Sequence, residues 1–580
     1  MKNLPTPQLA GHLLVQCLVA QGVTHAFGVP GESYLAVLDG FHRYREHIQF
    51  IVNRHEGGAA FMAEAHGKLT SKPGVCFVTR APGATNACIG VHTAFQDSTP
   101  LVLFVGDVAS DQRDREAFQE MDYRAMFGPS TMGMAKRVER IDDADRIPEY
   151  VARAFATALA GRPGPVVLVL PEDMLTQALD AAKLPRPLPP APAFGGEIGQ
   201  QPAQNIRVLL SKAERPLVIA GGSGWTPASA QALQHFAQTW CLPVGNAFRF
   251  QDTFDNYHPH YAGDVGIGIS PALARRIEEA DLILALGPRL GEMTTGGYTL
   301  LRVPRPTQTL IHIHASAEEL NRVYQADLAV HASMGTAAHA LAALEPPPDL
   351  PWRAWTAGCH ADYLANLQPS TIAALPADTE RGLVDMPRVM QALQKHLPAD
   401  AVVTNGAGNF ASWVHRFHRF HGLAKGHKTQ LAPTNGAMGY GVPAGIAAAI
   451  TTGRTVFTMA GDGDFLMNGQ ELATAVQYGA KTIIVLLNNG MYGTIRMHQE
   501  RAYPQRTVGA GTTLHNPDFA ALAQAFGYVG VRIQRSDQFE AELVAALARA
   551  QGTLIEVVLE PELISTRASL GTITQTALQR

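Results

Sequence analysis

The chain has 580 residues, of which 46% are hydrophobic and 17% are charged, and its formal net charge is -4. Because this length is too great for a single hydrophobic core, we expect about two to four domains. The near-neutral charge provides no basic surface for a polyanion, which argues against nucleic acid or an anionic membrane as the main partner and favours a small molecule.

The chain begins with MKNLPTPQLAG, which lacks the apolar core of a signal peptide. The longest apolar runs, such as residues 101–105 and 482–487, are far shorter than the ~20 residues of a membrane helix. The five cysteines are scattered and include no CxxC pair, so a disulfide framework and a zinc ribbon are both unexpected. We predict a cytoplasmic protein with no membrane partner.

A short β-branched run, a glycine-containing turn and an alanine-rich helical pattern recur along the whole chain. In chain order, the predicted strands are residues 75–79, 101–105, 166–170, 217–220, 282–286, 455–459 and 482–487. Continuous apolar runs that alternate with helices indicate parallel strands buried on both faces. The predicted fold class is therefore α/β with doubly wound parallel sheets, which bind ligands beyond the carboxyl ends of their strands.

Two proline-dense stretches, residues 184–194 and 345–352, interrupt this pattern. Proline lacks a backbone donor and restricts the residue before it, so neither stretch is expected to continue a helix or a central strand. Interpreted as linkers, they divide the chain into three α/β domains at 1–184, 195–345 and 353–580. Long surface loops within one domain are the alternative interpretation.

The predicted strand 455–459 leads into Ala-Gly-Asp-Gly-Asp, and Asp462 in this stretch is the first candidate metal ligand. Asn489 follows the next predicted strand, 27 residues after Asp462. A carboxylate and an amide oxygen at the ends of neighbouring strands suit Mg²⁺, which prefers oxygen ligands. The adjacent glycines allow backbone N–H groups to approach a diphosphate. Asp-Gly is also a common turn signal, and the spacing to Asn489 is what favours the metal site.

The string GDGDFLMNGQELATAVQYG and the later VLLNNGMYG resemble thiamine-diphosphate (ThDP) enzymes, in particular the acetolactate synthase branch. The resemblance implies that Asp462, Asn489 and the carbonyl of Met491 hold Mg²⁺, which bridges the cofactor diphosphate. It also implies two related ThDP-binding domains, N-terminal (PYR, for the pyrimidine) and C-terminal (PP, for the diphosphate), flanking a Rossmann-like central domain.

The same resemblance implies a set of cofactor-binding residues. Met438, in NGAMGYGVPAG, matches the apolar residue that wedges between the two cofactor rings, although a core methionine is the alternative. Asn409 and Phe410 replace the Gln-His of typical acetolactate synthases. The full implied set is Pro30, Glu56, Pro82, Gly83, Asn86, Gly406, Asn409, Phe410, Met438, Gly461, Gly463, Asp464 and Tyr492.

Glu56 lies in RHEGGAAF, just after the apolar run 48–52. Ala59 stands where HExxH would place its second histidine, which excludes a zinc-protease site here. Judged alone, Glu56 is a carboxylate at a helix N-terminus, where the dipole favours it. The family's HExxAA element matches this stretch, however, and it implies that Glu56 hydrogen-bonds the aminopyrimidine ring and promotes removal of the thiazolium C2 proton.

Five residues are candidates for catalysis or substrate binding by the same resemblance: Glu56, Gln119, Glu32, His498 and Arg289. Gln119, beside Phe118, would face the reacting carbons, and Arg289 would bind the carboxylate of an acceptor. Glu32 stands where acetolactate synthases usually have glycine. His498 stands where the family has the tryptophan that selects the acceptor. These two could form a proton-transfer pair or be ordinary polar rim residues. The stretch HIHAS (residues 312–316) lacks the acidic pattern of flavin-binding members, so FAD is doubtful.

The function implied is decarboxylation of a 2-oxo acid followed by carboligation, as in acetolactate synthase, which makes the enzyme an acyltransferase or lyase. The alternatives are a non-oxidative 2-oxo acid decarboxylase or another ThDP-dependent lyase without FAD and, from another class, a non-catalytic homologue. In the family two subunits complete each site, so the resemblance also implies a homodimer at minimum and a homotetramer as the common form.

Overall fold

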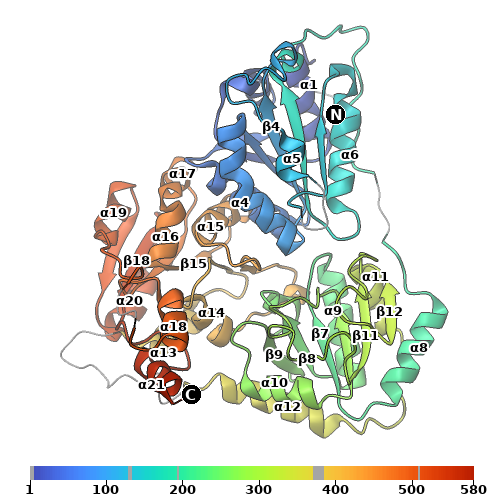
Figure 1. Cartoon of the computed structure of the whole chain (residues 1–580), viewed down its shortest axis with the longest axis vertical. Coiled ribbons are helices and arrows are strands. Elements are labelled where there is room, and N and C mark those ends of the chain that lie inside the picture. Colours follow the sequence, from blue (N-terminus) through green and yellow to red (C-terminus); the bar gives the residue numbers. More distant parts are fainter. Residues whose placement is uncertain (1–5, 129–132, 192–194, 370–383, 507–509, 580) are drawn as a thin grey trace. The chain divides into compact units, whose positions relative to one another are not determined.

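The computed structural model describes residues 6–128, 133–191, 195–369, 384–506 and 510–579 (Figure 1). Its contacts divide the chain into two compact units. The first comprises Met1–Ala193, Val442–Gly453 and Leu466–Ala480, and the second comprises Phe194–Gly441, Arg454–Phe465 and Lys481–Arg580. The chain forms three six-stranded parallel sheets, one in the first unit and two in the second.

The N-terminal sheet has the strand order β2-β1-β3-β4-β6-β5. Its strands are β1 (His25–Gly28), β2 (Gln49–Val52), β3 (Gly74–Val78), β4 (Leu101–Asp107), β5 (Arg137–Arg140) and β6 (Pro165–Pro171). One face packs against α1 (Ala10–Ala20), α2 (Leu35–Arg43) and α6 (Ile147–Leu159). The other is covered by α3 (Glu56–Thr70) and α4 (Ala81–Asp97), and Figure 1 shows α4 and α6 on opposite sides of the strands.

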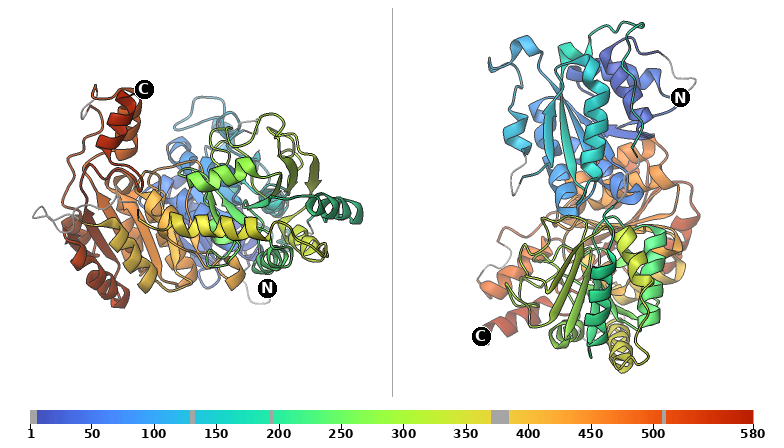
Figure 2. Two further views of the ribbon diagram at one scale, coloured as in Figure 1. Left: turned by 90° about the horizontal axis from the view of Figure 1, so that it is seen from below. Right: turned by 90° about the vertical axis from the view of Figure 1, so that its right-hand side faces the viewer.

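The central sheet has the order β12-β11-β10-β7-β8-β9. Its strands are β7 (Pro216–Ala220), β8 (Val244–Ala247), β9 (Tyr261–Val265), β10 (Leu282–Leu286), β11 (Thr309–His314) and β12 (Leu328–His331). The helices that accompany it are α8 (Gln200–Ser211), α9 (Pro227–Trp240), α10 (Pro271–Glu279), α11 (Met334–Ala342) and α12 (Arg353–Asn366). A continuous apolar core joins the sheet to these helices. Figure 2 shows the chain from two further directions.

The C-terminal sheet has the order β14-β13-β15-β16-β18-β17. Its strands are β13 (Val402–Asn405), β14 (Gln430–Leu431), β15 (Val456–Gly461), β16 (Ile483–Asn488), β17 (Val529–Ile533) and β18 (Thr553–Val558). The helices of this part of the chain that lie in the second unit are α13 (Met386–His396), α14 (Ala411–Phe417), α18 (Gly493–Ala502), α19 (Phe519–Ala525), α20 (Ser536–Ala548) and α21 (Leu570–Leu578). In the same stretch of sequence, α15 (Gly441–Thr452) from Val442 onwards and α17 (Leu472–Gln477) belong to the first unit, and α16 (Asp462–Asn468) is divided between the two units.

The predicted fold class is confirmed, because all three sheets are parallel and flanked by helices. Each predicted strand exists, and its ends differ from the prediction by at most two residues. Near the predicted metal site, β15 extends two residues beyond the predicted strand, through Gly461, which pairs with Leu487, and Asp462 is the first residue of α16. The described parts of both proline stretches contain no helix or strand, while the domain boundaries stay a prediction.

The five cysteines are all free. Within the part of the chain that the structure describes, no helix is both long and apolar enough to cross a membrane.

Helices α3 and α4 approach closely at Gly90. A Cβ atom on Gly90 would lie 2.3 Å from Ala60 Cβ and 2.7 Å from the Ala60 backbone carbon, so only glycine fits at this crossing. Glu56 precedes Ala60 by four residues and Asn86 precedes Gly90 by four, so each lies one helical turn from the crossing. The close packing of α3 on α4 therefore sets the separation of these two polar side chains.

Replacing Gly90 with valine is expected to destabilise the protein by about 1–3 kcal/mol, because the added carbons overpack the α3–α4 crossing. Urea unfolding followed by circular dichroism measures this change. Gly335→Val is the matched control, since Gly335 is also helical and a Cβ there would meet no heavy atom within 4 Å. Equal stability of the two variants would contradict the packing role of Gly90.

Candidate active site

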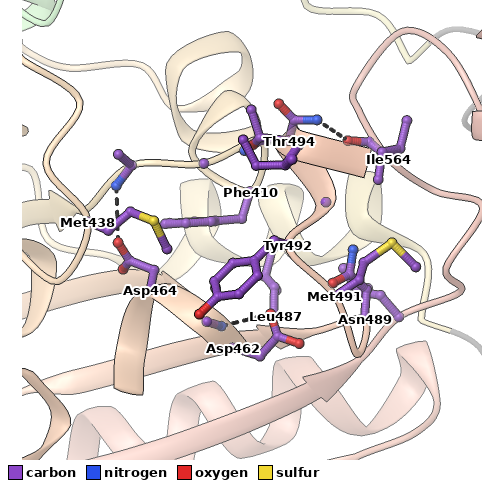
Figure 3. Close-up of a pocket in the computed structure, with 18 of the residues that line it drawn as sticks. Phe410, Met438, Asp462, Asp464, Leu487, Asn489, Met491, Tyr492, Thr494 and Ile564 are labelled. Atoms are coloured by element: carbon purple, nitrogen blue, oxygen red, sulfur yellow. Dashed lines mark hydrogen bonds between the residues drawn. The ribbon is translucent and has the colours of Figure 1, made fainter. Parts of the chain in front are cut away.

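A cavity of about 250 Å³ opens at the carboxyl ends of β13, β15 and β16 (Figure 3). This is the edge at which a doubly wound sheet binds ligands. Its lining residues lie at the ends of β15 and β16, in the segments after β13, β14, β15 and β16, or after β18, and they include Ala407, Gly408, Asn409, Phe410, Trp413, Met438, Gly461, Asp462, Gly463, Asp464, Leu487, Asn489, Met491, Tyr492, Thr494, Ile495 and Ile564. The structure thus brings the C-terminal candidates together in one cavity, most of them directly on its wall.

Three glycines form a cradle in this cavity because no side chain fits where they stand. A Cβ on Gly406 would lie 2.1 Å from Asp464 Oδ1, and one on Gly461 would lie 2.6 Å from the Phe410 ring. A Cβ on Gly463 would lie 2.5 Å from the Tyr492 ring. Their lack of side chains lets Asp464, Phe410 and Tyr492 pack directly on the backbone, and of the three glycines Gly461 and Gly463 line the cavity itself.

Asp464 links two walls of the cavity. Its Oδ1 accepts hydrogen bonds from the backbone N–H groups of Ala407 (3.1 Å) and Gly439 (2.9 Å). Its buried Oδ2 has no hydrogen-bond partner among the residues that the structure describes. Burial raises the pKa of Asp464 to about 7, although the two backbone hydrogen bonds act in the opposite direction. The carboxyl group therefore holds the loop after β13 against the segment that carries Met438.

Asp462 is held by backbone and side-chain donors on both oxygens. Oδ1 accepts from Gly463 N–H (2.9 Å), and Oδ2 accepts from Gly490 N–H (2.9 Å) and from Asn516 Nδ2 (2.8 Å). Burial raises its pKa, and these hydrogen bonds oppose the rise. Asn516, which also donates to Asn488 Oδ1 at 2.9 Å, was missed by the sequence analysis, since nothing in its local sequence connects it with a residue 54 positions earlier.

Asn489 and Met491 follow β16 and lie on the same side of the cavity as Asp462, whereas Met438 and Asp464 lie on the other (Figure 3). Backbone hydrogen bonds hold this turn in place, from Tyr492 N–H to Thr512 O (2.9 Å) and from Leu514 N–H to Gly490 O (2.8 Å). No cluster of three or more His, Cys, Asp and Glu side chains suited to a metal occurs in the described ranges. The available donors are a carboxylate, an amide and a carbonyl.

The residues that line the cavity are chemically suited to bind Mg²⁺ and a diphosphate. Oxygen donors from Asp462, Asn489 and Met491 are the kind that Mg²⁺ prefers, with diphosphate oxygens and water completing the coordination. Gly461 and Gly463 add no side chain to the cavity wall, which leaves room for a diphosphate, and the walls around Met438 and Phe410 are apolar enough to pack against an aromatic ring.

Glu56 begins α3, as the HExxAA element implies. Its Oε2 accepts a hydrogen bond from Asn86 Nδ2 at 2.9 Å, and a Cβ on Gly83 would lie 3.4 Å from its Oε1. The preceding His55 caps the helix, because its Nδ1 accepts from Gly57 N–H at 3.0 Å. The structure thus brings together Glu56, Asn86 and Gly83, three of the predicted pyrimidine-site residues of the N-terminal domain.

A second carboxylate supports the turn before Glu56. Glu471 is fully buried, and its Oε1 accepts from the backbone N–H groups of Arg54 and His55, both at 3.0 Å. Its Oε2 accepts from Asn53 Nδ2 (3.2 Å) and Thr474 Oγ1 (2.6 Å). Glu471 and the turn before Glu56 belong to the first unit, whereas Asp462, only nine residues before Glu471, belongs to the second. Glu471 was not predicted from the sequence, because nothing in the neighbouring residues indicates that this acid is buried or where its partners lie.

Arg80 connects the remaining N-terminal candidates. Its guanidinium pairs with Glu172 at 2.6 Å, lies 3.8 Å from Glu32 and donates to the Phe118 carbonyl at 3.3 Å. The adjacent Ala81 N–H donates to the Gln119 carbonyl at 3.2 Å. Arg80 was not a predicted site residue, yet it ties the loops that carry Glu32 and Gln119 to the end of β3. Pro30 and Pro82 are both exposed; Pro30 follows β1, and Pro82 lies in the first turn of α4.

The other candidates lie in the second unit. Arg289 follows β10, and its Nε is 3.6 Å from Glu319 Oε2. His498 is exposed on α18. Because Glu32 is in the first unit, its pairing with His498 stays a prediction. In HIHAS, His312 is buried in β11 with Nε2 3.0 Å from the Pro288 carbonyl, and burial lowers its pKa to about 4.

Three family models of known proteins match successive parts of the chain. Residues 9–126, 203–342 and 406–557 match the N-terminal TPP binding domain, the central domain and the C-terminal TPP binding domain of thiamine pyrophosphate enzymes. Thiamine pyrophosphate is another name for ThDP. The protein is therefore a ThDP-dependent enzyme.

Several curated relatives match nearly the whole chain. The Escherichia coli acetolactate synthase isozyme 2 large subunit is 30% identical over 94% of this chain and 95% of its own. The probable acetolactate synthase large subunit of Methanocaldococcus jannaschii is 30% identical over 94% and 91%. The Lactococcus lactis acetolactate synthase large subunit is 28% identical over 96% and 93%. The chain belongs to the acetolactate synthase large-subunit family.

Replacing Asp464 with alanine is expected to weaken ThDP binding about tenfold to a hundredfold while the fold is kept. The reason is the loss of two hydrogen bonds between cavity walls, at roughly 1.5–3 kcal/mol for a charged acceptor and about 1.4 kcal/mol per tenfold in affinity. Calorimetric titration with ThDP in the presence of Mg²⁺ measures the change. Asp464→Asn keeps an accepting oxygen and should lose less, whereas unchanged affinity in Asp464→Ala would refute this role.

Proposed function

We propose that this enzyme uses ThDP and Mg²⁺ to decarboxylate a 2-oxo acid and to join the remaining fragment to a second carbonyl compound, as its acetolactate synthase relatives are named for doing. The observation that carries the proposal is the cavity at the ends of β13, β15 and β16, where oxygen donors for Mg²⁺ meet a glycine cradle for diphosphate. ThDP, when bound, would supply the nucleophilic carbon needed for chemistry at the carbonyl of the 2-oxo acid.

Each group of residues then has a role. Asp462, Asn489 and the Met491 carbonyl would bind Mg²⁺, and the backbone at Gly406, Gly461 and Gly463 would bind the diphosphate. Met438 would separate the two rings of the cofactor, with Phe410, Asn409 and Tyr492 forming the adjoining walls. Asp464 would keep the cradle in shape through its bonds to Ala407 and Gly439.

At the other end of the cofactor, we assign Glu56 to hold a proton on Oε1 towards the pyrimidine ring, because its Oε2 is engaged by Asn86. Pro30, Pro82 and Gly83 would line that ring. Glu471 orients Glu56 indirectly, since it binds the two backbone N–H groups immediately before the helix. The pyrimidine and diphosphate residues belong to different units of the chain, and a homodimer in which two chains complete each site is part of the proposal.

The fate of the decarboxylated fragment depends on residues that select the acceptor. Arg289 would bind the acceptor carboxylate, Gln119 would face the reacting carbons, and Glu32 with His498 would move protons there. A 2-oxo acid decarboxylase or other lyase without FAD is the second candidate, favoured by Glu32 and His498, which replace the residues usual in acetolactate synthases. We further propose domain limits at 1–184, 195–345 and 353–580, a homotetramer and a cytoplasmic location.

Glu56→Gln is expected to keep the fold and ThDP binding but to lose most turnover, because an amide cannot exchange the proton that the carboxyl group holds. Steady-state CO₂ release from a 2-oxo acid with saturating ThDP and Mg²⁺ measures turnover, and circular dichroism checks the fold. Asp39→Asn is the control, since it neutralises an exposed carboxylate of the same domain. Activity of Glu56→Gln close to that of the wild type would remove Glu56 from catalysis.

A panel of 2-oxo acids with ThDP and Mg²⁺ distinguishes the two candidate reactions when CO₂, aldehyde and acyloin products are measured separately. Acetolactate formed from pyruvate is the expected result. Aldehyde as the sole organic product would replace carboligation with simple decarboxylation. If none of the acids released CO₂ although ThDP bound, the proposed reaction would be wrong while the family assignment stood.

A further inference from the structure

A second cavity, of about 270 Å³, lies within the second unit. Elements that flank the central sheet and elements that flank the C-terminal sheet both line it. One wall comes from the end of β9 and the start of α10, and another from α14 and the segment 565–568. Asn409 lines both this cavity and the proposed cofactor cavity. The charged and titratable groups discussed below line only the second one.

Arg416, on α14, enters this cavity with hydrogen bonds to neutral groups only. Its Nε donates to the Asn366 carbonyl (2.9 Å), its Nη1 to the Thr566 carbonyl (2.6 Å) and its Nη2 to the Gln368 carbonyl (3.0 Å). Backbone carbonyls orient the guanidinium but do not neutralise its charge.

Arg567 reaches the same place from the segment after β18. Its Nη2 donates to Asn366 Oδ1 (2.9 Å) and to the Gly268 carbonyl (3.3 Å), so both arginines meet at Asn366. No carboxylate of the described residues lies within 4.0 Å of either guanidinium. Burial lowers the pKa of both, and the charge of Arg567 lowers that of Arg416 further, to about 10. A guanidinium is basic enough to keep its charge at neutral pH even when partly buried.

Two further polar groups line the cavity without adding negative charge. Asp264 Oδ1 is buried and has no partner among the described residues, and burial raises the pKa of this carboxyl to about 8. His415 places Nδ1 2.9 Å from Gln251 Oε1 and leaves Nε2 without a partner in the described chain. Burial lowers the pKa of His415 to about 3, so its ring is neutral. Neither group compensates the two arginines.

We propose that this cavity binds a small organic anion, with Arg416 and Arg567 holding its phosphate or carboxylate group and with Asp264 and His415 hydrogen-bonding its uncharged polar part. Two partly buried positive charges without a counter-ion are unfavourable, and an oxyanion removes that penalty. The planar guanidinium matches the geometry of both kinds of oxyanion. The volume lies below the range of about 300–1,000 Å³ for drug-sized ligands, which favours a compact molecule.

The test uses the enzyme saturated with ThDP and Mg²⁺, which occupies the first cavity, and isothermal titration with inorganic phosphate, with succinate and with chloride at matched ionic strength. Phosphate or succinate should bind, and chloride should not. Tighter binding of phosphate identifies a phosphate ester as the ligand class, and tighter binding of succinate identifies a carboxylate. Arg567→Gln should weaken binding by at least about tenfold, since it removes a charged hydrogen-bond donor.

Arg275→Gln is the matched control, because it removes an equal charge from an exposed position on α10 near the same cavity and should leave anion binding unchanged. Arg567→Lys keeps the charge without the planar guanidinium and serves if Arg567→Gln does not fold; weaker binding in it supports the site. The proposal is overturned if neither anion binds the wild type, if chloride binds equally well, or if the Arg567 variants bind as tightly as Arg275→Gln.

Discussion

The parallel pairing of β15 with β16 is the interaction on which the candidate active site depends. In its register Gly461 stands opposite Leu487, β15 ends at Gly461 and β16 ends at Asn488, so Asp462 and Asn489 each directly follow their strand. Parallel strands end at the same edge of a sheet, and these two oxygen donors consequently meet although 26 residues separate them in the chain. A one-residue slip would change the direction of both side chains and dismantle the site.

Buried carboxylates shape both ends of the proposed cofactor site by accepting backbone N–H groups. Asp464 joins the loop after β13 to the segment carrying Met438, and Glu471 holds the turn that presents Glu56. Such bonds convert flexible loop backbone into defined walls, because an unpaired buried N–H group is costly. The residues that shape the loops are therefore distinct from those that would contact the cofactor.

Three buried or partly buried arginines differ in whether a carboxylate neutralises them. Arg80 is nearly buried and compensated by Glu172, as expected for a charge whose role is to hold loops together. Arg416 and Arg567 are also partly buried, but they bond only to neutral oxygens. The difference in compensation distinguishes a structural guanidinium from one that is available to an anionic ligand.

The sequence alone determined the α/β class, the principal central strands and the residues Glu56, Asp462 and Asn489, because apolar runs, glycine turns and motif spacing are local properties of the chain. It did not name the other strands, which include two-residue β14 and four-residue β8 as well as the six-residue β11 and β18, whose mixed polar and apolar residues do not form a continuous apolar run. It also missed Asn516, Glu471 and Arg80. The roles of these side chains arise from burial and from partners far away in sequence, and only the packing of the folded chain brings those partners within hydrogen-bonding distance.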